Sequence, residues 1–137
     1  MRTVWLVPAV AWVWSGCASA GARGVERRAP LPSCGHESVT REGGYDVGAR
    51  RCFWDAYREG RPAEFISTSV SVEGDPVTTI YRSVAPGRVE VYVDATKDRF
   101  GSGRWEKYTG KGLRLIQGGP VSPSFAPDGS FVESAAR

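Results

Sequence analysis

The hydrophobic positions of the chain change their spacing near residue 60, and this change separates a helical part from a strand-rich part. Before it, apolar residues recur every three or four positions, which predicts a helix with one buried stripe. The stripe consists of Ala49, Cys52, Phe53, Ala56 and Tyr57. Asp46 is suited to cap the amino end of this helix, and Gly60 and Pro62 predict where it ends.

Beyond residue 62, apolar and polar residues alternate, which is the pattern of half-buried β-strands. The clearest strand is Val89–Asp94, in which valine occupies every second position from its start. Ala63–Val72 and Val77–Arg82 precede it, and Arg104–Tyr108 follows it as a fourth strand. Leu113–Gln117 can add a short fifth strand.

The short connections between these segments predict that neighbouring strands are antiparallel. We therefore expect an α+β fold in residues 34–117, with one helix packed on a curved antiparallel sheet of about four strands. Cystatin-like and nuclear-transport-factor-like folds resemble this outline, in architecture alone. Residues 18–33 contain prolines and glycines without periodicity and are expected to form a flexible tether, and residues 118–137 a disordered tail.

An apolar run of twelve residues, Thr3–Trp14, follows Arg2 at the start of the chain. As a helix the run would extend about 18 Å, which is short of a hydrocarbon core of about 30 Å. Small residues follow it at once, so the layout is that of a secretion signal rather than of a membrane span. The competing interpretation, a buried helix of the domain, would need a helix with three tryptophans and no polar face.

The segment Trp14-Ser15-Gly16-Cys17 resembles the lipobox of bacterial lipoproteins, although Trp14 stands where that family usually has an aliphatic residue. The resemblance implies a signal over residues 1–17 and acylation of Cys17, which would hold the protein on a membrane. The alternative is cleavage after Ala18-Ser19-Ala20, which would leave a secreted protein beginning at Gly21.

The chain has three cysteines, and either cleavage removes Cys17 as a free thiol. The remaining pair in an exported protein predicts a disulfide between Cys34 and Cys52. Such a bond would contribute about 3 kcal/mol in the chain-entropy description. Two independent buried thiols are the alternative. Cys34, His36 and Cys52 match no zinc pattern, so we expect no metal and no cofactor.

Charge and motifs argue against several classes of function. The 18 basic and 15 acidic residues are interspersed and give a formal net charge of +3, which does not favour a nucleic-acid partner. His36 is the sole histidine, and the chain has neither a nucleophile elbow nor a phosphate-binding glycine loop. We therefore expect no catalytic activity, and a hydrolase built on His36 or on a carboxylate pair is a competing hypothesis.

One group of side chains is a candidate binding face. If the valines of Val89–Asp94 face the helix, Tyr92 faces outward, beside Tyr81 or Arg82 according to the register of the hairpin, and Trp105 joins it from the next strand. Aromatic residues and arginine are enriched at interfaces, so this face could bind a glycan or a partner protein. The alternative is cross-strand pairing that only stiffens an exposed sheet.

Residues 52–62, 73–76 and 94–101 resemble small exported bacterial proteins of unknown function, and this resemblance implies no activity. The sequence thus predicts an exported, lipid-anchored cell-envelope protein without catalytic activity, which binds an envelope protein or a cell-wall glycan. The alternative is a secreted module that binds a small ligand or acts as an inhibitor through the concave side of its sheet.

Overall fold

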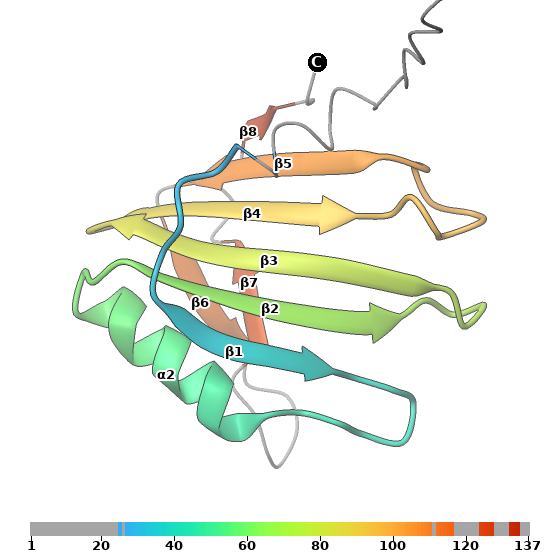
Figure 1. The fold of residues 1–137 in the computed structure, drawn as a ribbon, viewed down its shortest axis with the longest axis horizontal. Helices are drawn as coiled ribbons and strands as arrows, with labels where there is room; N and C mark the ends of the chain where they lie inside the picture. Colours follow the sequence, from blue (N-terminus) through green and yellow to red (C-terminus); the bar gives the residue numbers. More distant parts are fainter. Residues whose placement is uncertain (1–24, 26, 111, 117–123, 128–131, 135–137) are drawn as a thin grey trace, which may run out of the picture.

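The computed structural model of the protein describes residues 25, 27–110, 112–116, 124–127 and 132–134. The predicted signal, and with it Cys17, lies outside these residues. The elements in chain order are β1 (Ser33–Ser38), α2 (Val47–Arg58), β2 (Ala63–Val70), β3 (Pro76–Ala85), β4 (Arg88–Asp94), β5 (Trp105–Gly110), β6 (Leu113–Ile116), β7 (Ser124–Pro127) and β8 (Val132–Ser134) (Figure 1).

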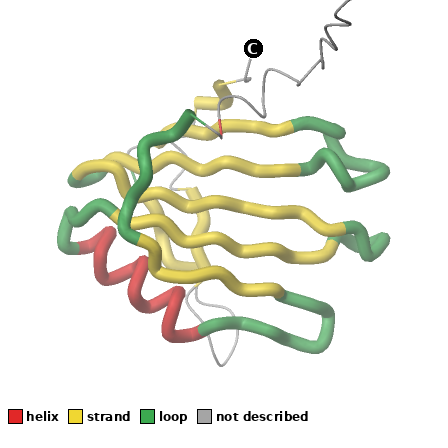
Figure 2. The backbone as a smooth tube through the Cα atoms, viewed as in Figure 1, coloured by secondary structure: helices red, strands yellow, loops and turns green. Residues whose placement is uncertain are grey.

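The fold is α+β, as predicted. Its main sheet has six strands in the order β1-β2-β3-β4-β5-β8, and β6 and β7 form a separate two-stranded sheet. Helix α2 and strand β6 pack on one face of the main sheet, where Leu113 joins the same core cluster as the helix. The segment that leads into β1 crosses the other face (Figures 1 and 2). The two faces therefore differ in what covers them.

Helix α2 forms where the apolar stripe predicted it. The side chain of Asp46 caps its amino end by accepting a hydrogen bond from the backbone of Ala49 at 2.8 Å. Beyond its carboxyl end Gly60 takes a positive φ of 69°, which a residue with a side chain adopts at a cost. The stripe then faces the sheet, and Phe53 and Ala56 are almost fully buried.

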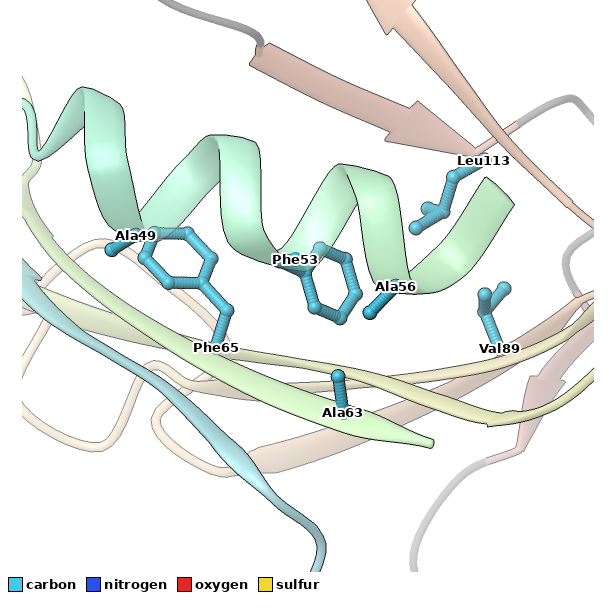
Figure 3. Packing of buried hydrophobic residues seen from close by; sticks show 7 residues of the cluster. All are labelled: Ala49, Phe53, Ala56, Ala63, Phe65, Val89 and Leu113. Atoms are coloured by element: carbon cyan, nitrogen blue, oxygen red, sulfur yellow. The ribbon is translucent and has the colours of Figure 1, made fainter. Parts of the chain in front are cut away.

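Three aromatic rings fill the space between α2 and the sheet. The ring of Phe53 lies 6.1 Å from that of Phe65 and 6.1 Å from that of Tyr81, and Phe65 and Tyr81 stack at 6.0 Å. Val89 and Leu113 close the carboxyl-terminal end of this cluster (Figure 3). Because the rings occupy the side of the sheet toward the helix, a small-ligand site on that side would have to displace them.

Strands β2 to β5 are antiparallel neighbours, as predicted from the short turns between them. The expectation of a wholly antiparallel sheet of about four strands is wrong in two respects. Strand β1 pairs with β2 in parallel, and β8 extends the sheet beyond β5. The parallel pair is possible because α2 carries the chain back across the sheet between β1 and β2.

The predicted tether and tail both include ordered structure. Residues 27–33 belong to the proposed tether of residues 18–33, yet they cross the sheet and lead directly into β1, and Val25 before them is buried. Strands β7 and β8 lie within the proposed disordered tail of residues 118–137. The segment before β1 is held because it meets partners on the sheet face opposite α2, as described below.

The predicted disulfide is confirmed: Cys34 and Cys52 are bonded, with their Cα atoms 5.6 Å apart. The bond joins β1 to α2 across a sequence separation of 18 residues. Disulfides persist in oxidising compartments, so the bond indicates an extracytoplasmic location. Among the residues that the structure describes, no helix is both long enough and apolar enough to cross a membrane.

Candidate functional site: the open face of the sheet

The face of the main sheet opposite α2, here called the open face, is defined by the strand register. Val89 packs toward the helix, so its neighbour Glu90 points the other way, as do Tyr92 and Asp94. The pairing of β4 with its neighbours then places Arg82 and Lys107 on this same face. The open face thus carries charged and aromatic side chains, in contrast to the apolar face below the helix.

The segment that crosses the open face is called the strap and comprises Val25 and residues 27–32. Val25 is buried against Ile80 and Tyr92. Arg28 donates two hydrogen bonds to the carboxylate of Glu64, at 3.0 and 3.1 Å. At the carboxyl end of the strap, the backbone carbonyl of Pro32 accepts a hydrogen bond from the amide of Glu64 at 2.8 Å. The strap is therefore held by an apolar contact, an ion pair and a backbone bond.

Below the strap, alternating charges form a network of five side chains, called the ionic network: Arg28, Glu64, Arg82, Glu90 and Lys107. Arg82 lies at its centre and is 4% exposed. Its Nε lies 3.0 Å from Glu64, and its Nη1 donates to Glu90 at 2.8 Å. Lys107 donates to the other oxygen of Glu90 at 2.8 Å. Each carboxylate of the network therefore has two cationic partners.

The strap also contacts the centre of the ionic network directly. Nη2 of Arg82 donates to the backbone carbonyl of Ala29. A buried guanidinium has five N–H groups to satisfy, and the strap supplies an acceptor that the sheet does not. The strap and the network therefore depend on one another, since an uncovered Arg82 would lose this partner.

Electrostatics within the network favour its charged form. Burial alone would raise the pKa of Glu90, but the hydrogen bond and charge of Lys107, with the charge of Arg82, lower that pKa below its usual value. Burial likewise opposes the charge of Lys107, and the bond to Glu90 overcomes it and raises the pKa of the lysine. Every charge of the network therefore has a partner of opposite sign, and its three cations exceed its two carboxylates by one positive charge.

The four predicted binding residues do not form one exposed face. Tyr81 lies on the helix side, between the rings of Phe53 and Phe65. Arg82 and Tyr92 lie on the open face, but the strap leaves them only 4% and 5% exposed. Trp105 also lies on the open face, half-buried against the cluster around Tyr92. Of the four, Trp105 alone is both on the open face and partly exposed.

Beyond the strap, toward the loops that follow β2 and β4, polar side chains line up across four strands. Thr68, Thr78, Asp94 and Trp105 are successive cross-strand partners in β2, β3, β4 and β5, and this set is called the polar row. The hydroxyls of Thr68 and Thr78 lie 3.1 Å apart. Nε2 of His36, from β1, lies 3.1 Å from the hydroxyl of Thr68 and continues the row. Sequence reasoning found Trp105 but missed the two threonines, since threonine is also a common strand residue.

The loop between Asp94 and Trp105, the last two members of the polar row, carries an exposed aromatic side chain. Phe100 is 78% exposed and lies in the loop that joins β4 to β5, between Asp94 and Trp105 in the chain. That loop is fixed to the turn after β2, because Nε of Arg99 donates to Asp75 at 2.9 Å. The polar row is thus bordered by a tied pair of loops.

The candidate hydrolase residues His36 and Glu37 lie on opposite faces of the sheet and do not share a water-excluded cleft in the described part of the chain. His36 is exposed. Glu37 is buried, but on the helix side, where Arg50 and Ser67 donate to its carboxylate. Burial would raise the pKa of Glu37, and these hydrogen bonds lower it, so the carboxylate is held ionised as a structural partner. Within the described part of the chain, no three His, Cys, Asp or Glu side chains are placed to hold a metal ion.

Comparisons with known proteins add no family to this description. No family model matches the chain, and neither a curated protein nor a solved structure matches it.

Proposed function

We propose that the chain is an exported protein of the bacterial cell envelope, held on a membrane through an acylated Cys17, without catalytic activity, and that it binds an envelope partner through the polar row. The observation that carries the binding role is the division of the open face. The strap covers the half that contains the ionic network, and in the other half Trp105 and Asp94 stay partly exposed.

Export is supported by two independent features. The apolar run of Thr3–Trp14 with the lipobox-like residues after it has the layout of a secretion signal. The Cys34–Cys52 disulfide requires an oxidising compartment to persist. Acylation at Cys17 supplies the anchor, and several acyl chains on one cysteine bind a bilayer stably because each buried methylene contributes about 0.8 kcal/mol.

A binding role is favoured over catalysis by the state of the charged groups. The carboxylates of Glu64 and Glu90 are each saturated by two cations, and that of Glu37 is held by Arg50. A general acid or base needs a pKa near neutral pH, whereas the pKa values of Glu37 and Glu90 are lowered.

Intact mass spectrometry of the protein isolated from its own membranes tests export and anchoring. We expect a mass that starts at Cys17, with added acyl chains and two hydrogens fewer than the reduced chain. A product that starts at Gly21 would refute the anchor and leave a secreted protein. A product that retains Arg2 in the cytoplasmic fraction would refute export.

Photo-crosslinking in living cells tests the binding role. A benzophenone side chain is placed at Thr78, within the polar row, and at Arg51, on the exposed side of α2, as a matched control. We expect a discrete adduct at Thr78 that protease or a glycan-degrading enzyme removes, and none at Arg51. Equal labelling at both positions would refute a binding role for the polar row.

A further inference from the structure

The polar row has the dimensions of a site for an extended chain molecule. Its members lie on four neighbouring strands, and strands are spaced about 4.8 Å apart, so the row extends about 14 Å across the sheet. His36 prolongs it onto β1. The strands that carry the row are consecutive neighbours from β1 to β5, so its members follow one line across the sheet.

Trp105 and its partner Asp94 provide two complementary kinds of contact. Trp105 packs against the cluster of Val25, Ile80 and Tyr92, which holds its side chain in place while the residue stays partly exposed. The face of an indole ring carries negative potential and attracts weakly positive C–H groups, such as those on one side of a pyranose. Phe100, on the adjoining loop, offers a second exposed ring.

Asp94 has unused capacity as an acceptor. Its Oδ1 accepts hydrogen bonds from the amide of Thr96 at 3.0 Å and from the hydroxyl of Thr96 at 2.6 Å. An ionised carboxylate offers about four lone-pair positions, so about two remain for hydroxyl groups of a ligand. Thr68 and Thr78 add hydroxyls that both donate and accept.

Charge at the row favours hydroxyl donors over an anionic polymer. Asp94 gives the row a negative charge, and two neighbouring cations are already paired. Lys107 is bound to Glu90 at 2.8 Å, and Arg99 to Asp75 at 2.9 Å. An anionic polymer would meet the carboxylate of Asp94, whereas hydroxyl groups would find an acceptor there.

From these observations we infer that the polar row binds an uncharged linear oligosaccharide, which stacks on Trp105 and donates hydroxyl hydrogen bonds to Asp94. The inference deepens the proposed function and rests on it, since it names the partner class of the same site.

Titration of the disulfide-bonded full chain, followed by nitrogen–proton correlation spectra, tests the inference. The probes are chitohexaose, cellohexaose and maltohexaose, with an oligogalacturonate of similar length as the anionic comparison. We expect at least one uncharged probe, at up to about 10 mM, to shift the indole N–H of Trp105 and the amide of Asp94. The indole N–H of Trp54, on α2, serves as the internal control.

Variants then assign the effect to the row. Trp105→Ala and Asp94→Asn should each weaken binding at least about tenfold, whereas Trp54→Ala should leave it unchanged. Shifts that the anionic probe produces equally, or no shift with any uncharged probe, would overturn the inference. If that failure came with a protease-sensitive adduct at Thr78, the row would bind a protein and the proposed function would stand. If no adduct formed either, both proposals would fail together.

Discussion

The contribution of Arg82 to stability is the most direct measure of whether the strap and the sheet form one unit. Substitution by alanine removes a guanidinium that is 4% exposed and leaves the carboxylates of Glu64 and Glu90 facing each other in a partly buried setting. Removing one partner of a buried ion pair lowers the free energy of unfolding by about 3 to 5 kcal/mol. Because Arg28 and Lys107 still partner the two carboxylates, we expect the lower end, about 3 kcal/mol.

Urea unfolding of the oxidised protein, followed by far-ultraviolet circular dichroism, measures this loss. With a denaturant slope of about 1.5 kcal/mol per molar, the midpoint should fall by about 2 M. The matched control is Arg61→Ala, because Arg61 pairs with Glu59 where the side chains are 58% and 59% exposed. That variant should change the free energy of unfolding by less than about 0.5 kcal/mol.

The pH dependence of the Arg82→Ala effect separates charge from packing. If the loss comes from a carboxylate deprived of its cation, it should shrink as pH falls below about 4.3 and through the lowered pKa of Glu90. A loss that stays constant down to about pH 3 would mean that Arg82 acts mainly through its contact area. A loss below about 1 kcal/mol at pH 7 would refute a buried ionic network under the strap.

Three further predictions concern stability, the first two measured by the same urea unfolding and the third by thermal unfolding. Replacing both Cys34 and Cys52 with alanine should lower the free energy of unfolding by about 3 kcal/mol, and an unchanged midpoint would contradict the cross-link. Phe53→Ala should cost about 3 to 5 kcal/mol, because the residue is fully buried between two rings, and a cost near 1 kcal/mol would contradict that packing. The lowered pKa values of Glu37 and Glu90 contribute stability that is present above the usual glutamate pKa, about 4.3, and lost as pH falls through the lowered values. The melting temperature should therefore drop on acidification from pH 5 to 3, and a constant value would contradict both ion pairs.

The elements that the sequence predicted correctly are those that bury one face against the core. Helix α2 has a regular apolar stripe and a capping aspartate at Asp46, so both its existence and its start were predictable. Strand β4 alternates valine with polar residues, so its valines were expected to face the helix, and Val89 packs in the core there. In each case local propensity and burial agree, so the pattern alone was sufficient.

The parts that sequence reasoning missed lack such a pattern. Strand β1, of sequence SCGHES, contains no alternation of large apolar residues, and it pairs in parallel because of a helix that lies later in the chain. The apolar residues of the strap follow neither a helical nor a strand period, and its hold depends on Glu64 and Arg82, which lie more than 30 positions away. Contacts of this kind depend on tertiary placement, which composition and periodicity do not specify.

A register shift in the β3–β4 hairpin decides which side chains of β3 lie on the open face. The register shifts by one between Ser83 and Ala85, just before the turn. This shift pairs Ile80 with Tyr92, whereas a continuous ladder from Ala85 opposite Arg88 would pair Tyr81 with Tyr92. A slip of one residue turns every side chain of a strand to the other face. The irregularity therefore puts the ring of Tyr81 into the core and the guanidinium of Arg82 between two carboxylates. The strap covers Arg82, so Trp105 remains as the aromatic residue with which the open face can meet a ligand.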